Sequence, residues 1–322
     1  MSGLGLGWGI AATGSIARTV GTVVREHPDM HVAAVGSRDL DRAAALAAEL
    51  GGAGAHGSYD ALVDDPSVEA VYVATPHPQH AAVVEAALRA GKAVLCEKPL
   101  TAELAETERL LEVAAASGGF LMEAVWMRFN PLVQRVVDLV EQGELGEIRS
   151  LSAAFGFHAP YDPAGRMWAP ELGGGALLDL GIYTVDLAQM VLGTPTSVEA
   201  TGSLAPTGVD QESSIALTYA SGARAQLAQS ILTDLPCTAL VVGSHGWAQL
   251  GPQFHAATEL VVQTGAGREE RTIDDERVGY AGELEEVARC RAAGLTESPR
   301  MPLSASLADM RVLDEARRAL SS

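Results

Sequence analysis

The stretch Ala93-Val94-Leu95-Cys96-Glu97-Lys98-Pro99-Leu100 indicates the fold of this chain. Its first four residues are apolar or small and predict a buried strand. The next three place a carboxylate, an ammonium and a proline at the end of that strand. Open α/β sheets bind their ligands outside the carboxyl ends of their strands. Lys98 is therefore a candidate functional residue; the alternative is a surface lysine on a turn that Pro99 ends.

Alternating strands and helices surround this stretch. Apolar runs at Leu6–Ile10, His31–Gly36, Val68–Ala74 and Phe120–Glu123 predict further strands, and segments with helical periodicity separate them. Elements that alternate at this length form a mostly parallel, doubly wound sheet. We therefore predict an α/β fold for the first part of the chain.

The turn after the first strand carries an imperfect dinucleotide-binding pattern. Aligned on Gly14, it reads Ala12-x-Gly14-x-x-Ala17, with alanine in place of the first glycine. Gly14 still lets the backbone approach a pyrophosphate, and the amides at the start of the next helix would face the phosphates. These features predict a Rossmann domain over residues 1-123. The candidate cofactor-binding residues here are Gly9, Ala12, Thr13, Gly14, Ser15 and Ile16.

The second strand ends at Ser37-Arg38, 23 residues past Gly14. An NAD-binding protein usually carries Asp or Glu at this place for the ribose 2′-hydroxyl. A hydroxyl followed by a guanidinium suits a 2′-phosphate instead, because arginine can bind a phosphate bidentately. We therefore predict NADP in preference to NAD. The alternative is a serine that caps the next helix beside a solvated arginine, and Asp39 would also serve as that cap.

The loop Thr75-Pro76-His77-Pro78-Gln79-His80 follows the strand at 68–74. If the first strand is placed correctly, this loop flanks the ribose on the nicotinamide side of the cofactor. Thr75, Pro76, His77 and His80 are therefore candidate cofactor contacts. Polar residues at a helix start are an equally good interpretation of the two histidines. In this frame Lys98 becomes a candidate catalytic lysine beside a nicotinamide ring, and the Lys98–Pro99 bond a candidate cis peptide.

The alternation stops after Glu123, and residues 124-322 form a second predicted domain. Short strands with glycine-bearing connections predict a large, mostly antiparallel sheet with one open face. Helices are expected at about 132–142, 175–192, 280–293 and 304–320, and the last is a candidate to pack back on the first domain. We expect helices to cover one face of the sheet, and Leu227, Val241 and Val261 to form an exposed apolar patch on the other. Such patches usually mark interfaces, so we expect a homodimer, or a dimer of dimers, through this sheet.

The helix expected at 175–192 carries a polar stripe. Asp179, Tyr183 and Asp186 are spaced i, i+4 and i+7 and so share one face of a helix that is otherwise rich in Leu, Ile and Val. This stripe predicts side chains that face a polar cavity. The alternative is a core tyrosine whose hydroxyl a neighbouring carboxylate satisfies.

Composition excludes several classes of partner. The formal charge of −19 argues against nucleic acid and anionic membranes. No apolar run approaches the roughly 18 residues that span a bilayer, and the N-terminus lacks the basic region of a signal peptide. The three cysteines (Cys96, Cys237 and Cys290) show no metal-ligand spacing and cannot all pair, which predicts no metal site and a reducing cytoplasm.

Taken in order, these motifs resemble the glucose–fructose oxidoreductase/inositol dehydrogenase/MocA (Gfo/Idh/MocA) family over essentially the whole chain. The similarity is closest to its branch of dimeric dihydrodiol dehydrogenases and NADP-dependent D-xylose dehydrogenases. The segments that carry it are Ala12–Gly14, Thr75–His80, Ala90–Pro99, Glu123–Trp126, Gly174–Tyr183 and Glu297–Leu303.

The resemblance implies roles for residues of this chain. Lys98 matches the lysine of a Glu-Lys-Pro motif, Asp179 the carboxylate of a second motif, and Tyr183 its general acid/base, where inositol dehydrogenase-like members tend to have His. Further implied cofactor contacts are Glu97, Glu123, Arg166 and Trp168. Candidate substrate-pocket residues are Trp126, Arg128, Phe155, Phe157 and Tyr161; for Trp126 and Phe155, simple core packing is an equally good interpretation. The pocket positions do not match one member well enough to transfer a substrate.

The implied reaction is hydride transfer at a carbon that bears a hydroxyl. A free tyrosine has a pKa of about 10, too high for a base near neutrality, so a nearby cation must favour its phenolate. We therefore expect Tyr183 to act as acid/base, Lys98 as the orienting cation and Asp179 as support, on a sugar, a sugar derivative or a cyclic diol. The alternatives are NAD-dependent glycoside cleavage, reduction of ketosugars or tetrapyrroles, and a regulator that binds NADP without catalysis.

Overall fold

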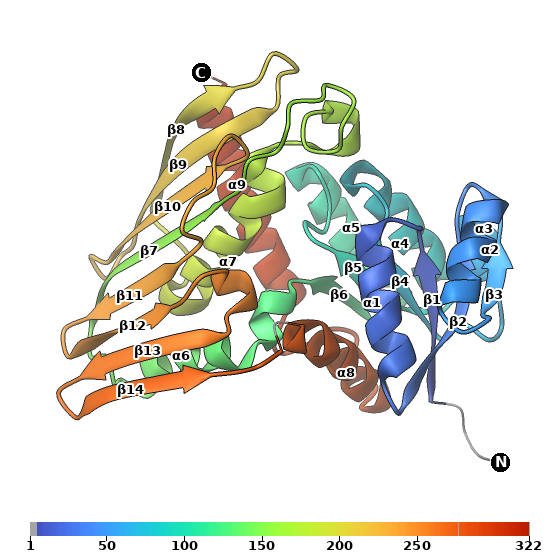
Figure 1. The fold of residues 1–322 in the computed structure, drawn as a ribbon, viewed down its shortest axis with the longest axis horizontal. Helices are drawn as coiled ribbons and strands as arrows, with labels where there is room; N and C mark the ends of the chain where they lie inside the picture. Colours follow the sequence, from blue (N-terminus) through green and yellow to red (C-terminus); the bar gives the residue numbers. More distant parts are fainter. Residues whose placement is uncertain (1–4, 276, 322) are drawn as a thin grey trace. The chain divides into compact units, whose positions relative to one another are not determined.

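Figure 1 shows the computed structural model, which describes residues 5–275 and 277–321. Within these residues the chain divides into two compact units. The first comprises residues up to Val125 together with Tyr280–Ser306, and the second comprises Trp126–Gly279 and the residues from Leu307 on.

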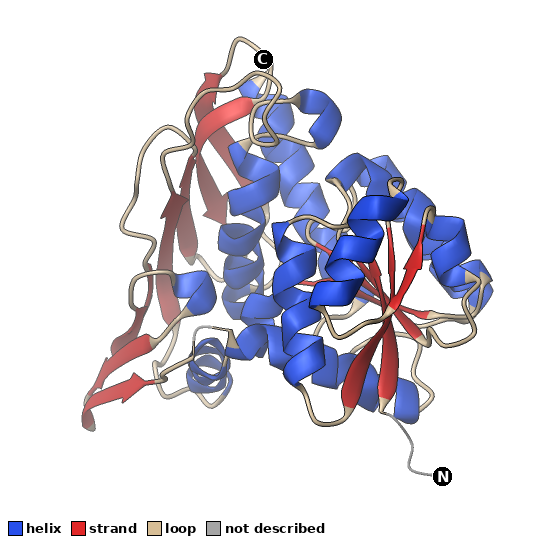
Figure 2. Cartoon of the chain, turned by 45° about the vertical axis from the view of Figure 1, so that its right-hand side comes forward, coloured by secondary structure: helices blue, strands red, loops and turns tan. Residues whose placement is uncertain are grey.

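The first unit contains a parallel sheet with strand order β3-β2-β1-β4-β5-β6. Its strands are β1 (Leu6–Ala11), β2 (Met30–Gly36), β3 (Gly54–His56), β4 (Ala70–Val73), β5 (Ala93–Glu97) and β6 (Leu121–Ala124). The helices between them are α1 (Ser15–Glu26), α2 (Leu40–Glu49), α3 (Tyr59–Val63), α4 (His80–Arg89) and α5 (Leu104–Ser117). This confirms the predicted doubly wound sheet, and Figure 2 shows its strands flanked by helices.

Burial explains why β4 and β5 lie in the interior of the first unit. Val71, Val94 and Leu121 are fully buried and belong to one apolar cluster with side chains of α4 and α5. Strands that helices cover on both faces are apolar along their whole length, which is why these runs were readable in the sequence. The short strand β3 and helix α3 were not predicted, because a few residues show no periodicity.

The helix α8 (Val278–Ala292) belongs to the first unit from Tyr280 on, although the predicted second domain included it. After this helix, the Thr296 carbonyl oxygen accepts a hydrogen bond from the Leu121 amide at the edge strand β6. Arg291 also pairs with Glu69 at 2.8 Å. The periodicity of a helix does not reveal which sheet it joins, so this assignment depends on tertiary contacts.

The second unit contains a sheet with strand order β14-β13-β12-β11-β7-β10-β9-β8. Its strands are β7 (Ile148–Gly156), β8 (Ser197–Leu204), β9 (Asp210–Thr218), β10 (Arg224–Ser230), β11 (Ala239–Gly243), β12 (Gly246–Leu250), β13 (Glu259–Thr264) and β14 (Gly267–Thr272). β7 and β10 pair in parallel and the other neighbours pair antiparallel, which confirms a mostly antiparallel sheet.

Helices of the second unit lie on one face of this sheet, and the other face is open (Figures 1 and 2). They are α6 (Pro131–Glu141), α7 (Ile182–Leu192) and most of α9 (Leu303–Leu320). The prediction for the open face was wrong for two residues: Leu227 and Val241 are each only 2% exposed, whereas Val261 is half-buried. Successive side chains of a strand point to opposite faces of the sheet. An error of one residue in deciding which side chains face the helices therefore assigns a residue to the wrong face.

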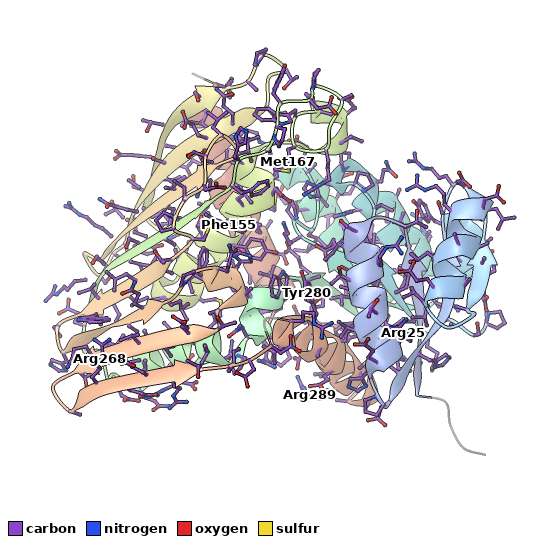
Figure 3. All side chains as sticks on the ribbon, in the orientation of Figure 1. Arg25, Phe155, Met167, Arg268, Tyr280 and Arg289 are labelled. Atoms are coloured by element: carbon purple, nitrogen blue, oxygen red, sulfur yellow. The ribbon has the colours of Figure 1, made fainter. Side chains whose placement is uncertain are left out.

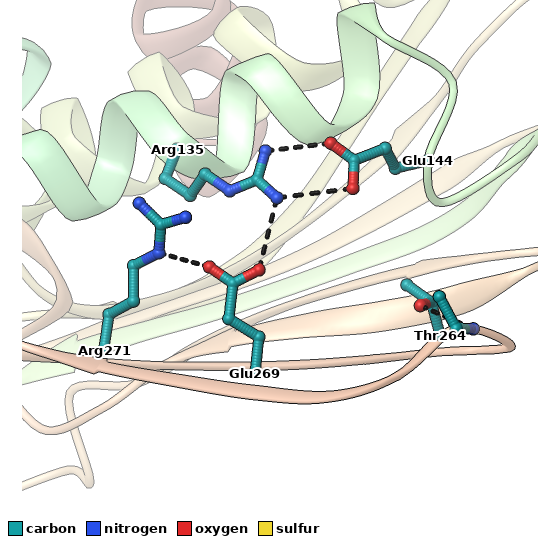
Figure 4. A network of polar contacts seen from close by, with 6 residues as sticks. Arg135, Glu144, Thr264, Glu269 and Arg271 are labelled. Atoms are coloured by element: carbon teal, nitrogen blue, oxygen red, sulfur yellow. Dashed lines mark hydrogen bonds and ion pairs between the residues drawn. The ribbon is translucent and has the colours of Figure 1, made fainter.

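The edge strand β14 was not predicted, because its sequence is Gly-Arg-Glu-Glu-Arg-Thr and lacks apolar alternation. Charged side chains are common on edge strands, where they discourage pairing with other chains. Here they also make contacts within the unit: Arg135 of α6 binds Glu144 at 2.9 Å and Glu269 of β14 at 3.2 Å, and Arg271 pairs with Glu269 (Figure 4). The Arg135 hydrogen bond lowers the pKa of Glu269, so this carboxylate is held ionised.

The segment Pro170–Leu192 has the length and composition of a helix that could cross a membrane. However, 83% of its most apolar window is buried inside the structure. This degree of burial is typical of a core helix, and this helix carries Tyr183.

Candidate active site

The turn after β1 leaves room for a phosphate. Gly14 precedes the first residue of α1, and no side chain caps that helix. A Cβ placed on Gly14 would meet no atom within 4 Å among the described residues, so the space beside the first helical amides is open. Uncapped amides at a helix N-terminus bind anions. This turn therefore fits the pyrophosphate of a dinucleotide.

The backbone adds a structural role to two of the predicted residues, Ala12 in this turn and Gly9 before it. Ala12 has φ 130°, a backbone conformation that favours glycine, so alanine follows the path of the missing first glycine. Gly9 lies inside β1, where a Cβ would come within 2.8 Å of the Val68 side chain. Its contacts therefore give Gly9 a packing role in the sheet.

Two arginines follow β2: Arg38, just after the strand, and Arg42, on α2. Asp39, and not Ser37, caps α2, because its carboxylate accepts a hydrogen bond from the Arg42 amide at 3.1 Å. Burial raises the pKa of the Tyr59 phenol, and the positive charges of Arg38 and Arg42 act in the opposite direction. Both guanidiniums therefore lie near Tyr59. Arg42 was missed from the sequence, although its spacing of four from Arg38 was visible.

The ends of β4 and β5 are tied together by His80. This fully buried ring places Nδ1 3.0 Å from the Pro99 carbonyl oxygen and Nε2 2.8 Å from the Thr75 carbonyl oxygen. Burial lowers the pKa of His80 although these carbonyls favour its charged form. Since both ring nitrogens lie beside backbone carbonyls, His80 helps to hold the loop.

Other residues of the same loop remain candidates for cofactor contacts. Thr75 Oγ1 is buried, and within the described part of the chain it has no hydrogen-bond partner. Such an atom fits a ligand hydroxyl. His77 is buried and packs edge-to-face on His80 with ring centroids 5.6 Å apart, and Pro76 is half-buried beside it. Thr13 lies in the turn before α1, and Ser15 and Ile16 are the first two residues of this helix.

Two carboxylates hold the backbone around Lys98. The Lys98–Pro99 bond is cis, which confirms that prediction. Glu97 accepts hydrogen bonds from the Tyr72 hydroxyl and from the Lys98 amide, the latter at 3.2 Å. Glu123, fully buried on β6, accepts a hydrogen bond from the Leu100 amide at 2.9 Å. Lys98 itself is half-buried at the turn before Pro99.

A second buried acid lies near Glu97. Glu283 of α8 is fully buried, and neither oxygen of its carboxyl group has a hydrogen-bond partner in the described residues. Burial raises the pKa of Glu283 well above its usual value, and the negative charge of Glu97 adds to this effect. Burial beside Glu97 likewise raises the pKa of the Tyr72 phenol. The arrangement favours the neutral form of Glu283.

The second unit builds its candidate site around Tyr183. The buried Tyr183 hydroxyl accepts a hydrogen bond from Trp126 Nε1 at 2.7 Å. Trp126 belongs to the short 3₁₀ turn η2 (Trp126–Phe129), and Tyr183 lies in the first turn of α7. An N–H that donates to a phenol oxygen interacts more strongly when this oxygen is ionised.

The two acids of the predicted stripe pair with arginines. Asp186 is fully buried and accepts from Arg128 Nε at 2.8 Å, and Asp179 accepts from Arg166 at 2.8 Å. The helix is not a regular α-helix here: Leu177–Gly181 forms a π-helical turn, η4, that leads into α7. π-Helical turns are rare in proteins, and those that occur are often found at functional sites.

Aromatic side chains form two groups around these residues. Phe155, on β7 (Figure 3), stacks on His255 with ring centroids 4.1 Å apart. The centroid of the Tyr183 ring lies 5.8 Å from that of Phe155 and 5.1 Å from that of His255.

The second aromatic group lies at Tyr161. This exposed side chain packs on Trp168, whose indole N–H donates to the Pro160 carbonyl. Phe157 is half-buried just after β7. His255, in the short turn η5 (Phe254–Ala256), was missed because a lone histidine in a loop carries no periodicity.

Models of known families match both units. A model described as an oxidoreductase family with an NAD-binding Rossmann fold matches residues 6–125, and a GFO/IDH/MocA C-terminal domain matches residues 133–249. The chain belongs to the Gfo/Idh/MocA family. This confirms the resemblance inferred from the sequence, and it makes the protein an NAD(P)-binding oxidoreductase.

Curated relatives and solved structures agree with this assignment. Trans-1,2-dihydrobenzene-1,2-diol dehydrogenase from Mus musculus is 39% identical over 98% of this chain and 97% of its own length. The 3-ketoreductase KijD10 from Actinomadura kijaniata, solved with NADP and TDP-benzene, is 29% identical, with a TM-score of 0.86 and 98% of each chain covered. Aldose-aldose oxidoreductase from Caulobacter crescentus, solved with glycerol, is 27% identical, with a TM-score of 0.89 and 98% of each chain covered.

The neutral Glu283 predicts a specific pH dependence of stability. Its folded pKa lies above its unfolded value, so the free energy of unfolding falls as pH rises from the unfolded pKa towards the folded one. Glu283→Gln keeps the shape and cannot ionise. We therefore expect the stability of the variant relative to wild type to increase between pH 5 and pH 8.5, measured by urea unfolding at several pH values.

Glu112→Gln, an exposed position on α5, is the matched control and should show no such trend. A stability difference between Glu283→Gln and wild type that stays constant with pH would contradict the neutral state of Glu283.

Proposed function

We propose that this protein is an NADP(H)-dependent oxidoreductase that transfers a hydride between the nicotinamide and a hydroxyl-bearing carbon, or carbonyl, of a sugar, a sugar derivative or a cyclic diol. The observation that carries the proposal is the buried Tyr183 hydroxyl, which accepts a hydrogen bond from Trp126 among aromatic rings. A buried phenol in a ring-lined site suits proton exchange with a cyclic alcohol. The relatives named as diol dehydrogenase, 3-ketoreductase and aldose oxidoreductase support the same substrate class.

The residues that would hold NADP lie at the carboxyl ends of the parallel strands. The open turn at Gly14 would take the pyrophosphate, and Ser37 with Arg38 and Arg42 would take the 2′-phosphate. Thr75 Oγ1 would donate to or accept from a ribose hydroxyl. When bound, the cofactor supplies a carbon that accepts or donates the hydride.

The residues of this chain handle the proton. In oxidation, the Tyr183 phenolate would accept the proton of the substrate hydroxyl, and in reduction the phenol would return it. Lys98 would supply a positive charge that favours the phenolate and orients the substrate oxygen. Asp179 would act indirectly. Its ion pair with Arg166 holds the segment around Arg166 against the helix that carries Tyr183.

Aromatic side chains determine what shape of substrate suits the site. Phe155 and Trp126 pack against the Tyr183 ring, and the C–H face of a cyclic substrate suits such aromatic surroundings. Arg128 is paired with the buried Asp186, so we assign it to holding η2 in place. A cyclic substrate with hydroxyls on one edge fits this combination of aromatic rings and one proton-exchanging phenol.

Substitutions at Tyr183 and Lys98 test the mechanism. We expect Tyr183→Phe and Lys98→Ala each to lower kcat by about 100-fold or more, because a positioned acid/base contributes roughly 10²–10⁴ to the rate. NADPH binding, followed by nicotinamide fluorescence, should remain. The assay is a panel of sugars, diols and ketosugars read at the nicotinamide absorbance.

Tyr219→Phe is a matched control, because this buried hydroxyl has no hydrogen-bond partner among the described residues. Near wild-type turnover in Tyr183→Phe or Lys98→Ala would refute the role of that residue. Turnover of a glycoside without a net change in absorbance would instead favour transient use of the cofactor in glycoside cleavage, and NADPH binding without turnover of the panel would favour a regulator.

Substitution at the end of β2 tests cofactor choice. Removing one charge-assisted hydrogen-bond donor costs about 1.5–3 kcal/mol. We therefore expect Arg38→Ala to raise the dissociation constant of NADP about 10- to 100-fold and to leave that of NAD nearly unchanged, measured by fluorescence titration. Tighter binding of NAD than of NADP by the wild-type chain would overturn the assignment of Ser37 and Arg38.

We also propose a homodimer through the open face of the second unit. A hollow of about 660 Å³ on this face spans β7, β10, β9 and β8 and is lined by small and polar residues such as Ser152, Ala216 and Gln226. Small side chains let a second sheet approach closely. We expect Ala216→Arg to convert a dimer to a monomer in sedimentation equilibrium, and a monomeric wild type would contradict this.

The three cysteines are unpaired and buried. Together with their scattered spacing, this suits a reducing compartment. We propose a cytoplasmic location, which cell fractionation would check.

A further inference from the structure

Asp210 binds the start of the helix that carries Tyr183. Its carboxylate Oδ2 accepts a hydrogen bond from the Leu177 amide at 2.6 Å, and the Ala176 amide donates to the same carboxylate. The first amides of a helix have no partner within the helix, and an aspartate at this end also meets the positive end of the helix dipole. Asp210 is the first residue of β9, so the sheet itself supplies this cap.

The backbone in front of the helix is shaped to admit this carboxylate. Gly175 has φ 116°, a conformation that favours glycine. A Cβ on Gly175 would lie 2.3 Å from Asp210 Oδ1, far inside contact distance. The Gly175 amide donates to the Met167 carbonyl at 3.0 Å, which holds the turn in this form. Glycine at this position therefore leaves the space that Asp210 occupies.

A second polar contact ties the same helix to the same sheet. The Ser213 hydroxyl of β9 donates to Gln229 of β10 at 2.8 Å, and the Gln229 side-chain amide donates to the Thr184 hydroxyl at 2.7 Å. Thr184 follows Tyr183 directly. The strands therefore hold the helix at its start through Asp210 and beside Tyr183 through Gln229, on either side of the π-helical turn η4.

We propose that Asp210 is a positioning residue for Tyr183: by capping the helix at Leu177 and Ala176, its carboxylate fixes the register of η4 and so the place of the Tyr183 hydroxyl. This inference rests on the proposed role of Tyr183 as acid/base. Asp210 acts through the helix and is not assigned a contact with substrate or cofactor.

The charge of Asp210 changes within the working range of an enzyme. Burial raises its pKa to about 7, although the two helix amides and the positive charge of Arg317 on α9 act in the opposite direction. Other titratable side chains on the elements packed against Asp210 have partners of their own: Asp314, Asp179 and Glu212. Asp210 is therefore a carboxylate above about pH 7 and a neutral acid below it.

The variant Asp210→Asn tests the proposal. Asparagine is uncharged and has one side-chain oxygen as acceptor, so it imitates the protonated form of Asp210. We expect kcat at pH 8 to fall about tenfold with an unchanged KM for NADP, because a displaced reactive group lowers the rate of the chemical step. Below pH 6 the wild type should approach the variant. Glu212→Gln, the same charge change two residues along β9, is the control.

Stability separates positioning from a general loss of structure. The folded pKa of Asp210 lies above its unfolded value, so the free energy of unfolding of the wild type falls as pH rises from about 4 to about 7. Asp210→Asn escapes this loss and should unfold at an equal or higher temperature at pH 8. A variant that is at least as stable yet slower identifies a positioning role, and a wild-type-to-variant ratio of kcat that is constant with pH refutes it.

Hydrogen–deuterium exchange provides a measurement that does not depend on activity. At pH 8, peptides covering 176–186 should exchange faster in Asp210→Asn than in wild type, while peptides of α6 should not change. Equal exchange of 176–186 in both proteins refutes the cap. Full activity of Tyr183→Phe together with faster exchange in Asp210→Asn would instead refute the acid/base role and leave the cap in place.

Discussion

The need to satisfy buried backbone amides determines how the chain passes Lys98. The strands β4, β5 and β6 are parallel and end at the same edge, where their last residues turn away from the sheet. There Glu97 accepts from the Lys98 amide and Glu123 from the Leu100 amide, and His80 meets the carbonyls of Thr75 and Pro99. An unpaired polar group in such surroundings costs about 1–3 kcal/mol. The residues that flank Lys98 are therefore held before any ligand binds.

A related constraint applies to the second unit, where a helix and not a loop presents the phenol. The helix that carries Tyr183 is buried on most sides, so its position depends on polar contacts with its neighbours. Asp210 caps its start, Gln229 holds Thr184, and Trp126 donates to Tyr183 itself. Buried hydrogen bonds that are all satisfied give a unique arrangement, because any shift would leave at least one of them unpaired.

Sequence reasoning recovered the strands of both sheets well where their residues were either wholly apolar or alternating. It also placed Lys98 at the end of β5 and Tyr183 on a buried helix. Packing adds roles that the sequence did not show. Gly9 packs closely against Val68, and His80 places both ring nitrogens beside backbone carbonyls. Leu227 and Val241 were assigned to the wrong face of the sheet.

The amino-acid sequence by itself determined the fold class, the family and the two candidate catalytic residues, because periodicity and short motifs are local properties of the chain. Only the tertiary structure decided the partners of these residues. Glu283 near Glu97, Asp210 at the start of the helix and His255 on Phe155 are each distant in sequence from the residue they affect. No local pattern records such a pairing, because burial and contact arise only when separate segments pack together.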